Sequence, residues 1–229
     1  MPSEPQSKTP RLMERKRSMA RNVMLDAAER LLISNTHPDF SMRALCDEAG
    51  VSFTTPFKYF GSKSGILTAL ANRLIDEIHN RYLQRPSSGD AIDRVFAMAR
   101  IGAEVLLGRP AVNRYIAGTS VTSDGEGGAT EMLRPATGLW TEALGSLDGI
   151  EEECRALAMQ TLPVGCAVAF RGVMALWINR DIEDQDFTPL LEMQVGALLL
   201  GYAPPGRKQH LTTVLANASR ALKHSQLVS

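Results

Sequence analysis

The segment spanning residues 40–64 constrains the fold more than any other part of the chain. It reads as a short helix with Ser41 as its N-cap, followed by a stop at Gly50. Glycine suits the left-handed backbone that ends a helix at a tight turn. Val51 then supplies an apolar side chain that can pack under the turn, and Ser52 can serve as the N-cap of the next helix. The spacing therefore predicts a helix-turn-helix whose second helix begins at Ser52.

An ordinary corner between two short helices would also explain the glycine turn. The residues after the turn favour a different function, because Phe57-Lys58-Tyr59-Phe60 is rich in aromatic and basic side chains. Ser62-Lys63 then opens a further helix. A helix-turn-helix places its second helix in the major groove of DNA. The segment therefore predicts a DNA-binding head.

The second helix should present one face to DNA and dock with the other. The expected groove face carries Phe53, Thr54, Phe57 and Lys58, and the docking face carries Val51, Thr55 and Tyr59 or Phe60. Thr54 and Lys58 can hydrogen-bond to base edges, and an exposed Phe53 can pack on a thymine methyl. Tyr59 and Lys63 suit phosphate oxygens. Each one alone would be an ordinary solvated surface residue, but together they give the candidate DNA-binding set: Arg17, Arg21, Ser41, Arg43, Ser52, Phe53, Thr54, Thr55, Lys58, Tyr59 and Lys63.

Charge and composition narrow the class of protein to which the chain can belong. Its 229 residues are 44% hydrophobic and have zero net charge, but residues 1–63 hold 10 Lys or Arg against 7 Asp or Glu. The excess of positive charge near the motif suits a polyanion. The longest uncharged stretches, 156–170 and 193–206, are too short to span a membrane. A polar N-terminus without a secretory pattern, and three scattered cysteines, favour a reduced cytoplasmic protein with no metal and no cofactor.

Helical periodicity covers nearly the whole chain, and no alternating strand pattern occurs. The sequence predicts an all-α protein of about nine or ten helices. Residues 1–14 are expected to form a disordered basic tail, residues 15–63 a three-helix helix-turn-helix domain, and residues 64–229 a helical domain for effector binding and dimerisation.

The motif and its flanking residues resemble a known family. Residues 14–70 look like the DNA-binding region of TetR/AcrR-type transcriptional regulators. The resemblance lies in Leu31-Leu32, Ser41, Gly50-Val51-Ser52, Phe57-Lys58-Tyr59-Phe60 and Ser62-Lys63. Three positions depart from the family pattern: Cys46 replaces a small alanine, Pro56 an aliphatic residue and Gly65 an acidic residue. Pro56 in the first helical turn costs at most about one backbone hydrogen bond.

A run of basic residues lies before and within the first expected helix: Lys8, Arg11, Arg15, Lys16, Arg17 and Arg21. One interpretation is an arm that adds phosphate contacts or enters the minor groove. The other is a solvated basic terminus that only aids solubility. The sequence does not choose between them.

The resemblance implies a homodimer on a palindromic double-stranded DNA operator. We expect the interface on two strongly apolar helices, in the residues Gly165, Ala169, Gly172, Leu176, Leu191, Val195, Leu198 and Leu199. Small residues allow two helices to approach closely. The alternative is that both helices are buried within one subunit.

The resemblance also implies a pocket for a small effector in the middle of the C-terminal domain. The candidate pocket residues are Phe96, Met98, Arg100, Ile101, Glu104, Tyr115, Met132, Trp140, Phe170, Met174 and Trp177, with Asn113 and Arg114 as further polar anchors. Methionine and tryptophan suit an adaptable apolar cavity, which favours a hydrophobic or amphipathic ligand. Plain core residues are the alternative for any one of them.

The predicted function is therefore a sequence-specific transcriptional regulator, most simply a repressor that leaves its operator when a small molecule binds. Two other classes compete with it. An enzyme is disfavoured because the four histidines are scattered and no cluster has catalytic or metal-binding spacing. A helical module whose basic head binds a protein partner, without specific DNA binding, is the stronger alternative.

Overall fold

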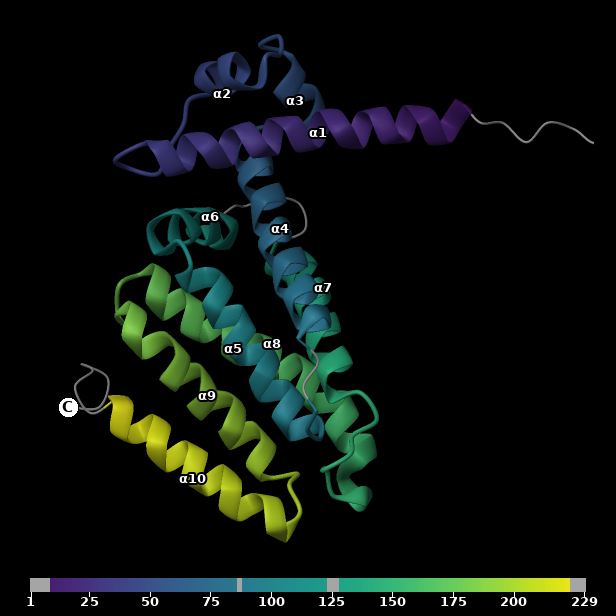
Figure 1. Cartoon of the computed structure of the whole chain (residues 1–229), viewed down its shortest axis with the longest axis vertical. Coiled ribbons are helices and arrows are strands. Elements are labelled where there is room, and N and C mark those ends of the chain that lie inside the picture. The colour runs from purple at the N-terminus through teal and green to yellow at the C-terminus, as the bar shows by residue number, and fades with distance from the viewer. Residues whose placement is uncertain (1–8, 86–87, 123–127, 223–229) are drawn as a thin grey trace, which may run out of the picture. The chain divides into compact units, whose positions relative to one another are not determined.

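A computed structural model describes residues 9–85, 88–122 and 128–222. These residues form ten α-helices and one 3-10 turn, and no β-strand occurs among them. The chain divides into two compact units, Met1–Leu70 and Ala71–Ser229 (Figure 1). The all-α class is as predicted, whereas the boundary between the units falls after Leu70 rather than after Lys63.

The N-terminal unit consists of α1 (Thr9–Ser34), α2 (Met42–Ala49), α3 (Thr55–Phe60) and the first turns of α4 (Lys63–Gln84). Figure 1 shows α2 and α3 beside each other along α1. The core of this unit is formed by buried apolar side chains of α1, α2 and α4 and of the loop before α2: Met24, Leu25, Ala27, Ala28, Leu32, Phe40, Leu45, Cys46, Ile66, Leu67, Ala69 and Leu70.

The first helix is longer than the sequence predicts. Residues 9–14, expected in a disordered tail, belong to α1, and residues 1–8 lie outside the described part of the chain. Every side chain from Met13 to Met19 is exposed, so this part of α1 has no apolar face from which a helix could be recognised. Arginine, lysine, methionine and alanine nevertheless favour helix, and they continue α1 outward.

The turn after α2 forms as predicted. The Ser41 hydroxyl accepts a hydrogen bond from the Ala44 amide at 3.0 Å and caps the helix. Gly50 ends it in the left-handed conformation, with φ of 65°. The Val51 amide donates to the Cys46 carbonyl at 3.0 Å, so the chain leaves α2 through a closed turn.

The helix after the turn begins later than predicted. Its N-cap is Thr54, and the Ser52 hydroxyl instead lies 2.8 Å from the Thr55 hydroxyl. Pro56 is therefore the second helical residue, where the backbone has no hydrogen bond to donate within the helix. The expected cost of Pro56 does not arise, because the proline lies in the first turn and its ring is buried.

The start of α4 explains the departure at Gly65. The Ser62 hydroxyl accepts from the Gly65 amide at 3.1 Å and caps the helix. A Cβ atom on Gly65 would lie 2.0 Å from the Phe60 carbonyl oxygen, so a side chain does not fit there without a backbone shift. The glycine weakens the helix, but it allows α4 to start directly against the end of α3.

The C-terminal unit contains the remainder of α4 and six further helices. They are α5 (Ala91–Leu107), α6 (Pro110–Thr122), α7 (Gly128–Leu144), α8 (Arg155–Ile178), α9 (Asp184–Leu200) and α10 (Pro205–Ala221), with a 3-10 turn at Glu152–Cys154 before α8. The loop expected at residues 123–128 lies outside the described residues except for Gly128, which begins α7.

Helix α5 and helix α8 organise this unit. Helix α5 packs against α6, α7 and α9; α8 packs against α6, α7 and α9; and α10 covers α9 (Figure 1). Four aromatic side chains run through the core. The ring of Phe170 lies 6.2 Å from Trp140 and 6.0 Å from Phe187, and Phe187 lies 5.6 Å from Trp177.

One arginine ties α5 to the end of α7. Arg94 donates to the carbonyls of Ala143 and Leu144, at 2.9 and 3.1 Å, and to Asp148 in the following loop, at 2.5 Å. Its guanidinium group thus satisfies carbonyls that the last turn of a helix leaves open. The hydrogen bond from Arg94 lowers the pKa of Asp148 from 3.8 to about 2, and a hydrogen bond from Ser146 adds to this effect.

Replacement of Gly50 by alanine should destabilise the N-terminal unit by about 1–2 kcal/mol, because a Cβ atom is strained at positive φ. No atom lies within 4 Å of the Cβ position, so the cost is one of backbone conformation alone. Urea denaturation of the full chain measures it. Gly138→Ala in α7 is the matched control, since it also has open space but no positive φ, and should be neutral or stabilising by up to about 1 kcal/mol. Equal effects of the two variants would contradict this account.

The pair of Arg94 and Asp148 should contribute to stability in a pH-dependent way. Because the pKa of Asp148 is lower in the folded protein, folding favours the charged carboxylate. The contribution is present above about pH 4 and disappears as the pH falls toward 2. Asp148→Asn should therefore lower the melting temperature at pH 7 and have less effect as the solution is acidified. A melting-temperature difference that stays constant as the solution is acidified from about pH 6 to about pH 3 would rule out this linkage.

Candidate nucleic-acid interface

Helix α3 divides its side chains as the sequence predicts. Phe53, Thr54, Phe57 and Lys58 are exposed in the segment that leads into and forms this helix. The docking residues Val51, Thr55, Tyr59 and Phe60 are partly buried, and Pro56 joins them as a buried residue. One face of the short helix is thus fixed to its unit while the other is open to a partner.

Arg21 braces the docked face. Its guanidinium group donates to the Tyr59 carbonyl at 3.3 Å and lies over the Phe60 ring, 4.5 Å from the centroid. The sequence predicts Arg21 as a DNA-binding residue. In the structure its side chain connects α1 to the last turn of α3, so its first effect is to position the exposed face. The separation of 38 residues between these partners left no local sequence signal for this contact.

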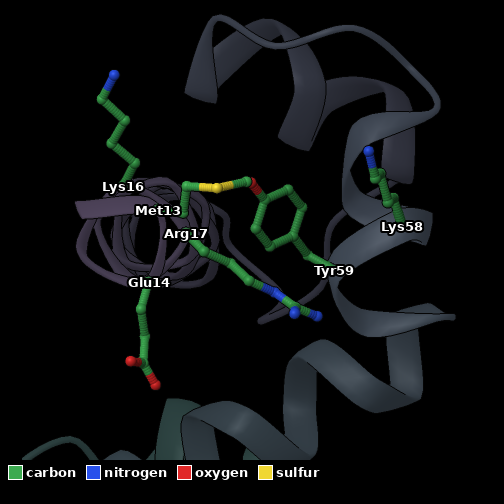
Figure 2. A pocket seen from close by; sticks show the side chains of 6 residues that line it. All are labelled: Met13, Glu14, Lys16, Arg17, Lys58 and Tyr59. Atoms are coloured by element: carbon green, nitrogen blue, oxygen red, sulfur yellow. The ribbon is translucent and has the colours of Figure 1, made fainter. Parts of the chain in front are cut away.

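A hollow of about 690 Å³ lies between α1 and α3. It is lined by Met13, Glu14, Lys16, Arg17, Lys58 and Tyr59. Figure 2 shows the Tyr59 ring reaching toward α1 between Met13 and Arg17, with Lys58 on the α3 side. Three of the six residues are cationic and one is acidic, so the hollow has a positive balance of charge. The sequence predicts Arg17, Lys58 and Tyr59 as DNA-binding residues, whereas Lys16 belongs only to the basic run that either contacts phosphates or is solvated.

Lys63 lies in a different setting from the one predicted. Its ammonium group pairs with the Asp39 carboxylate and lies 5.1 Å from the centroid of the Phe40 ring. The three residues belong to a second hollow, of about 520 Å³, which the N-cap Ser41 also lines. The side chain of Lys63 remains one-third exposed, so a phosphate can reach it, but only in competition with Asp39.

The other predicted residues serve different purposes. The Ser41 hydroxyl caps α2, and the Ser52 hydroxyl bonds to the hydroxyls of Thr54 and Thr55, at 3.3 and 2.8 Å. Arg43 is exposed on α2. The side chains of Lys8 and Arg11, in the basic run, lie outside the described residues.

The family comparison adds to this geometry. Residues 24–70 match the family model described as "Bacterial regulatory proteins, tetR family". These residues are a TetR-type DNA-binding domain. The matched range covers the buried half of α1, the glycine turn, α3 and the start of α4, and it excludes the exposed first half of α1. No curated protein sequence matches the chain.

The TetR-type fold extends over most of the chain. The crystal structure of a TetR transcriptional regulator from Rhodococcus sp. RHA1 has 21% sequence identity to the chain and a TM-score of 0.64. The similarity covers 83% of this chain and 100% of that one. This likeness concerns the fold. Together with the domain match, it confirms the predicted resemblance and the architecture of a helix-turn-helix domain followed by a helical domain.

The predicted dimer residues separate into two groups. On α9, Leu191, Val195 and Leu199 have no exposed surface and pack inside the subunit. A contact of these residues with a second copy stays a prediction. Leu198 is partly buried, and its side chain lies within about 4 Å of where a Cβ atom on Gly165 would be. Periodicity could not distinguish these positions, because apolar residues occur on most sides of α9.

Helix α8 carries a more exposed apolar face than the predicted one. Gly165, Ala169, Gly172 and Leu176 are partly buried or exposed, whereas Leu157, Val164 and Val168 are 54%, 45% and 53% exposed. Their spacing puts these three on one side of the helix, together with Gly172. The segment Glu152–Ile178 is also long and apolar enough to span a membrane, but this is weak evidence, because core helices of soluble proteins have the same property.

The predicted effector residues form a packed core in the described part of the C-terminal unit. Phe96, Met98, Ile101, Trp140 and Trp177 are buried, Phe170, Met174 and Tyr115 are partly buried, and the side chain of Met132 lies outside the described residues. The chain of aromatic contacts through Phe187 brings Trp140, Phe170 and Trp177 together. A role for these residues in ligand binding stays a prediction.

The polar residues proposed as ligand anchors have protein partners. Arg100 pairs with Glu192 at 2.6 Å, and Glu104 pairs with Arg85 at 2.9 Å. Asn113 donates to the Val105 and Leu106 carbonyls at the end of α5.

Arg114 lies over the Trp177 ring and bonds to its carbonyl at 3.0 Å and to Asp184 at 2.7 Å. Arg114 therefore connects α6 to the junction of α8 and α9. Among the described residues, no group of three or more His, Cys, Asp or Glu side chains could hold a metal ion.

Proposed function

We propose that this protein is a TetR-type transcriptional regulator that binds a palindromic operator as a homodimer. The proposal rests on the family match of the N-terminal unit and on the side chains that this unit exposes. The unit matches the TetR DNA-binding domain and presents one exposed face of α3 beside the basic side chains of α1. A helix-turn-helix of this kind reads bases from the major groove. Since such a regulator works where the chromosome is, the proposal places the protein in the cytoplasm.

The first half of α1 contributes phosphate contacts in this proposal. Lys16 and Arg17 lie on the same hollow as Lys58 and Tyr59, and all four side chains are exposed or partly exposed. The hollow borders the reading helix, so a DNA backbone that follows the groove edge passes beside it. Phosphate contacts of this type fix the position of the protein without reading sequence. Of the two interpretations of the basic run, this proposal takes the one with phosphate contacts and assigns them to Lys16 and Arg17 on α1.

The dimer contact is proposed on the exposed face of α8. Leu157, Val164 and Val168 expose about half of their surface in one subunit, which is unusual for large apolar residues that stand in a row. Gly172 on the same side permits close approach of a second helix. A dimer is also what a palindromic operator demands, because one small head makes too few base contacts for high specificity.

The C-terminal unit is proposed to bind a small effector that weakens operator binding. Support comes from the chemistry of the aromatic chain from Trp140 to Trp177, whose polarizable apolar side chains pack together between α7, α8 and α9. Side chains of this kind suit a hydrophobic or amphipathic ligand. A repressor released by its ligand is the simplest regulator of this design. A protein-interaction module with a basic head remains the second candidate, because its basic surface does not require DNA.

The salt dependence of DNA binding distinguishes these candidates. The full-length protein should bind DNA from its own upstream region with sequence preference and with an affinity that falls steeply as salt rises. Lys16→Gln and Arg17→Gln together should flatten the slope of log K against log salt by about 0.9 for each phosphate that the two cations neutralise. Fluorescence anisotropy with labelled duplexes measures both quantities. Binding without sequence preference would support the interaction module instead.

Arg15→Gln is the matched control for this experiment. It removes the same charge from an exposed position on α1 that does not line the hollow. The slope should stay close to that of the unchanged protein. If Arg15→Gln flattens the slope as much, per charge removed, as the combined change of Lys16 and Arg17, the effect is one of general charge, and the hollow makes no specific contact.

A charge on the α8 face should separate the dimer. Val168→Glu places a carboxylate where the proposal puts the centre of an apolar interface, and an unpaired charge is costly to bury. Sedimentation or light scattering should show a folded monomer at micromolar concentration, with a loss of operator affinity of roughly tenfold or more. Leu83→Glu on α4 is the matched control, because Leu83 is 55% exposed, about as much as Val168. A dimer that survives Val168→Glu would place the interface elsewhere.

A further inference from the structure

Two phenylalanines stand at the open face of α3. Phe53 is 56% exposed and Phe57 is 40% exposed, and both lie on the surface that the helix-turn-helix presents outward. Their rings contact each other, with centroids 5.4 Å apart and planes inclined at 56°. Large apolar side chains that are exposed side by side usually mark a place where a partner binds.

The backbone beneath the two rings is held in place. The Cys46 thiol donates a weak hydrogen bond to the Phe53 carbonyl, with sulfur and oxygen 3.9 Å apart. Burial, together with the nearby Asp47 carboxylate, raises the pKa of this thiol, so it keeps the proton that it donates. On the other side, Pro56 is buried in the first turn of α3 and fixes its own φ angle. The rings are therefore presented at a defined place.

The side chains around the pair are polar. Thr54 and Lys58 are exposed next to Phe53 and Phe57 in the sequence, and Lys58 also lines the hollow shared with α1. An apolar centre with a cationic rim fits a surface that is itself apolar at its centre and negatively charged at its edges. The major groove has this character where thymine occurs, since phosphates border it and the thymine C5 methyl projects into it.

A phenylalanine ring cannot read the remaining groups of the groove. It has no hydrogen-bond donor or acceptor to match the amino, carbonyl and ring-nitrogen groups of the base edges. The methyl group of thymine is the one apolar group that the four base pairs present there. Among the groups that base pairs present in the groove, the two rings can therefore contact the thymine methyl but cannot hydrogen-bond to the others.

We propose that Phe53 and Phe57 together read thymine by packing on its C5 methyl groups in the major groove. This inference rests on the proposed function and adds its specificity to it. The operator then carries thymine, or another base with a C5 methyl, opposite the ring pair in each half-site. Thr54 and Lys58 make the hydrogen bonds and phosphate contacts around this apolar centre.

The test uses the methyl group itself as the variable. Binding sites are selected from a random duplex pool with the full-length protein, and each thymine of the selected site is then replaced by deoxyuridine, which lacks only the C5 methyl. Affinity should fall about four-fold for each contacted methyl that is removed. It should stay unchanged for thymines outside the contact. Anisotropy titration at fixed salt measures the ratio of the two dissociation constants.

A protein variant tests whether the two rings are the groups that sense the methyl. The double variant of Phe53→Ala and Phe57→Ala should bind thymine and deoxyuridine duplexes equally, because the rings that sense the methyl are gone. Both side chains are exposed, so the fold is expected to persist, and circular dichroism checks it. Thr54→Ser is the matched control. It removes a side-chain methyl that could also contact thymine, and it should leave the discrimination intact.

The outcomes separate this inference from the proposed function. Specific, salt-sensitive binding with no difference between thymine and deoxyuridine overturns the methyl contact alone and leaves the regulator in place. Discrimination that survives in the double alanine variant overturns it as well, since another group would then sense the methyl. A pool that yields no preferred duplex overturns both proposals. Replacement of a contacted thymine by 5-methylcytosine, with guanine opposite, should keep more affinity than replacement by cytosine.

Discussion

Helix α3 has six residues, and a helix of that length is not stable in water by itself. The exposed face of the N-terminal unit therefore exists only because other parts of the unit hold this helix. Gly50 turns the chain out of α2 in a left-handed conformation, and Pro56 docks as a buried ring. Arg21 reaches from α1 to the end of α3, and Gly65 lets α4 begin against its last carbonyl. Each contact acts on a different end or face, so their combined effect fixes the direction of the helix.

Local chemistry explains which parts of this unit could be predicted. A cap such as Ser41 and a left-handed stop such as Gly50 depend on the few residues around them, and both were visible in the sequence. The start of α3 depends on a competition between hydroxyl groups. Ser52 bonds to the hydroxyls of Thr54 and Thr55 and so does not cap the helix, which no spacing rule would reveal. The contact of Arg21 with Tyr59 depends on tertiary packing and was equally hidden.

In the C-terminal unit, the sequence predicts the helices but not which of their faces are buried. Helices α8 and α9 are apolar on most sides, so periodicity could identify them as helices but could not assign their faces. Only packing shows that Leu191 is enclosed while Val164 and Val168 are open. The predicted pocket residues illustrate the same limit. Arg100 and Glu104 were candidates for ligand contacts, yet each has an ion-pair partner outside its own helix, Glu192 for Arg100 and Arg85 at the end of α4 for Glu104.

If the protein binds DNA as proposed, the ion pair between Lys63 and Asp39 has a consequence for its search along a chromosome. A phosphate that takes Lys63 displaces a carboxylate that already neutralises it, so the contact yields less than one made by an unpaired lysine. This reduction is the same for every base sequence, because phosphates are the same everywhere. It would shorten the residence time on random DNA and at the correct site by the same factor, so the ratio of the two affinities would not change. A regulator whose phosphate-binding lysine is already paired with a carboxylate would leave wrong sites faster. It would therefore scan more of the genome in a given time.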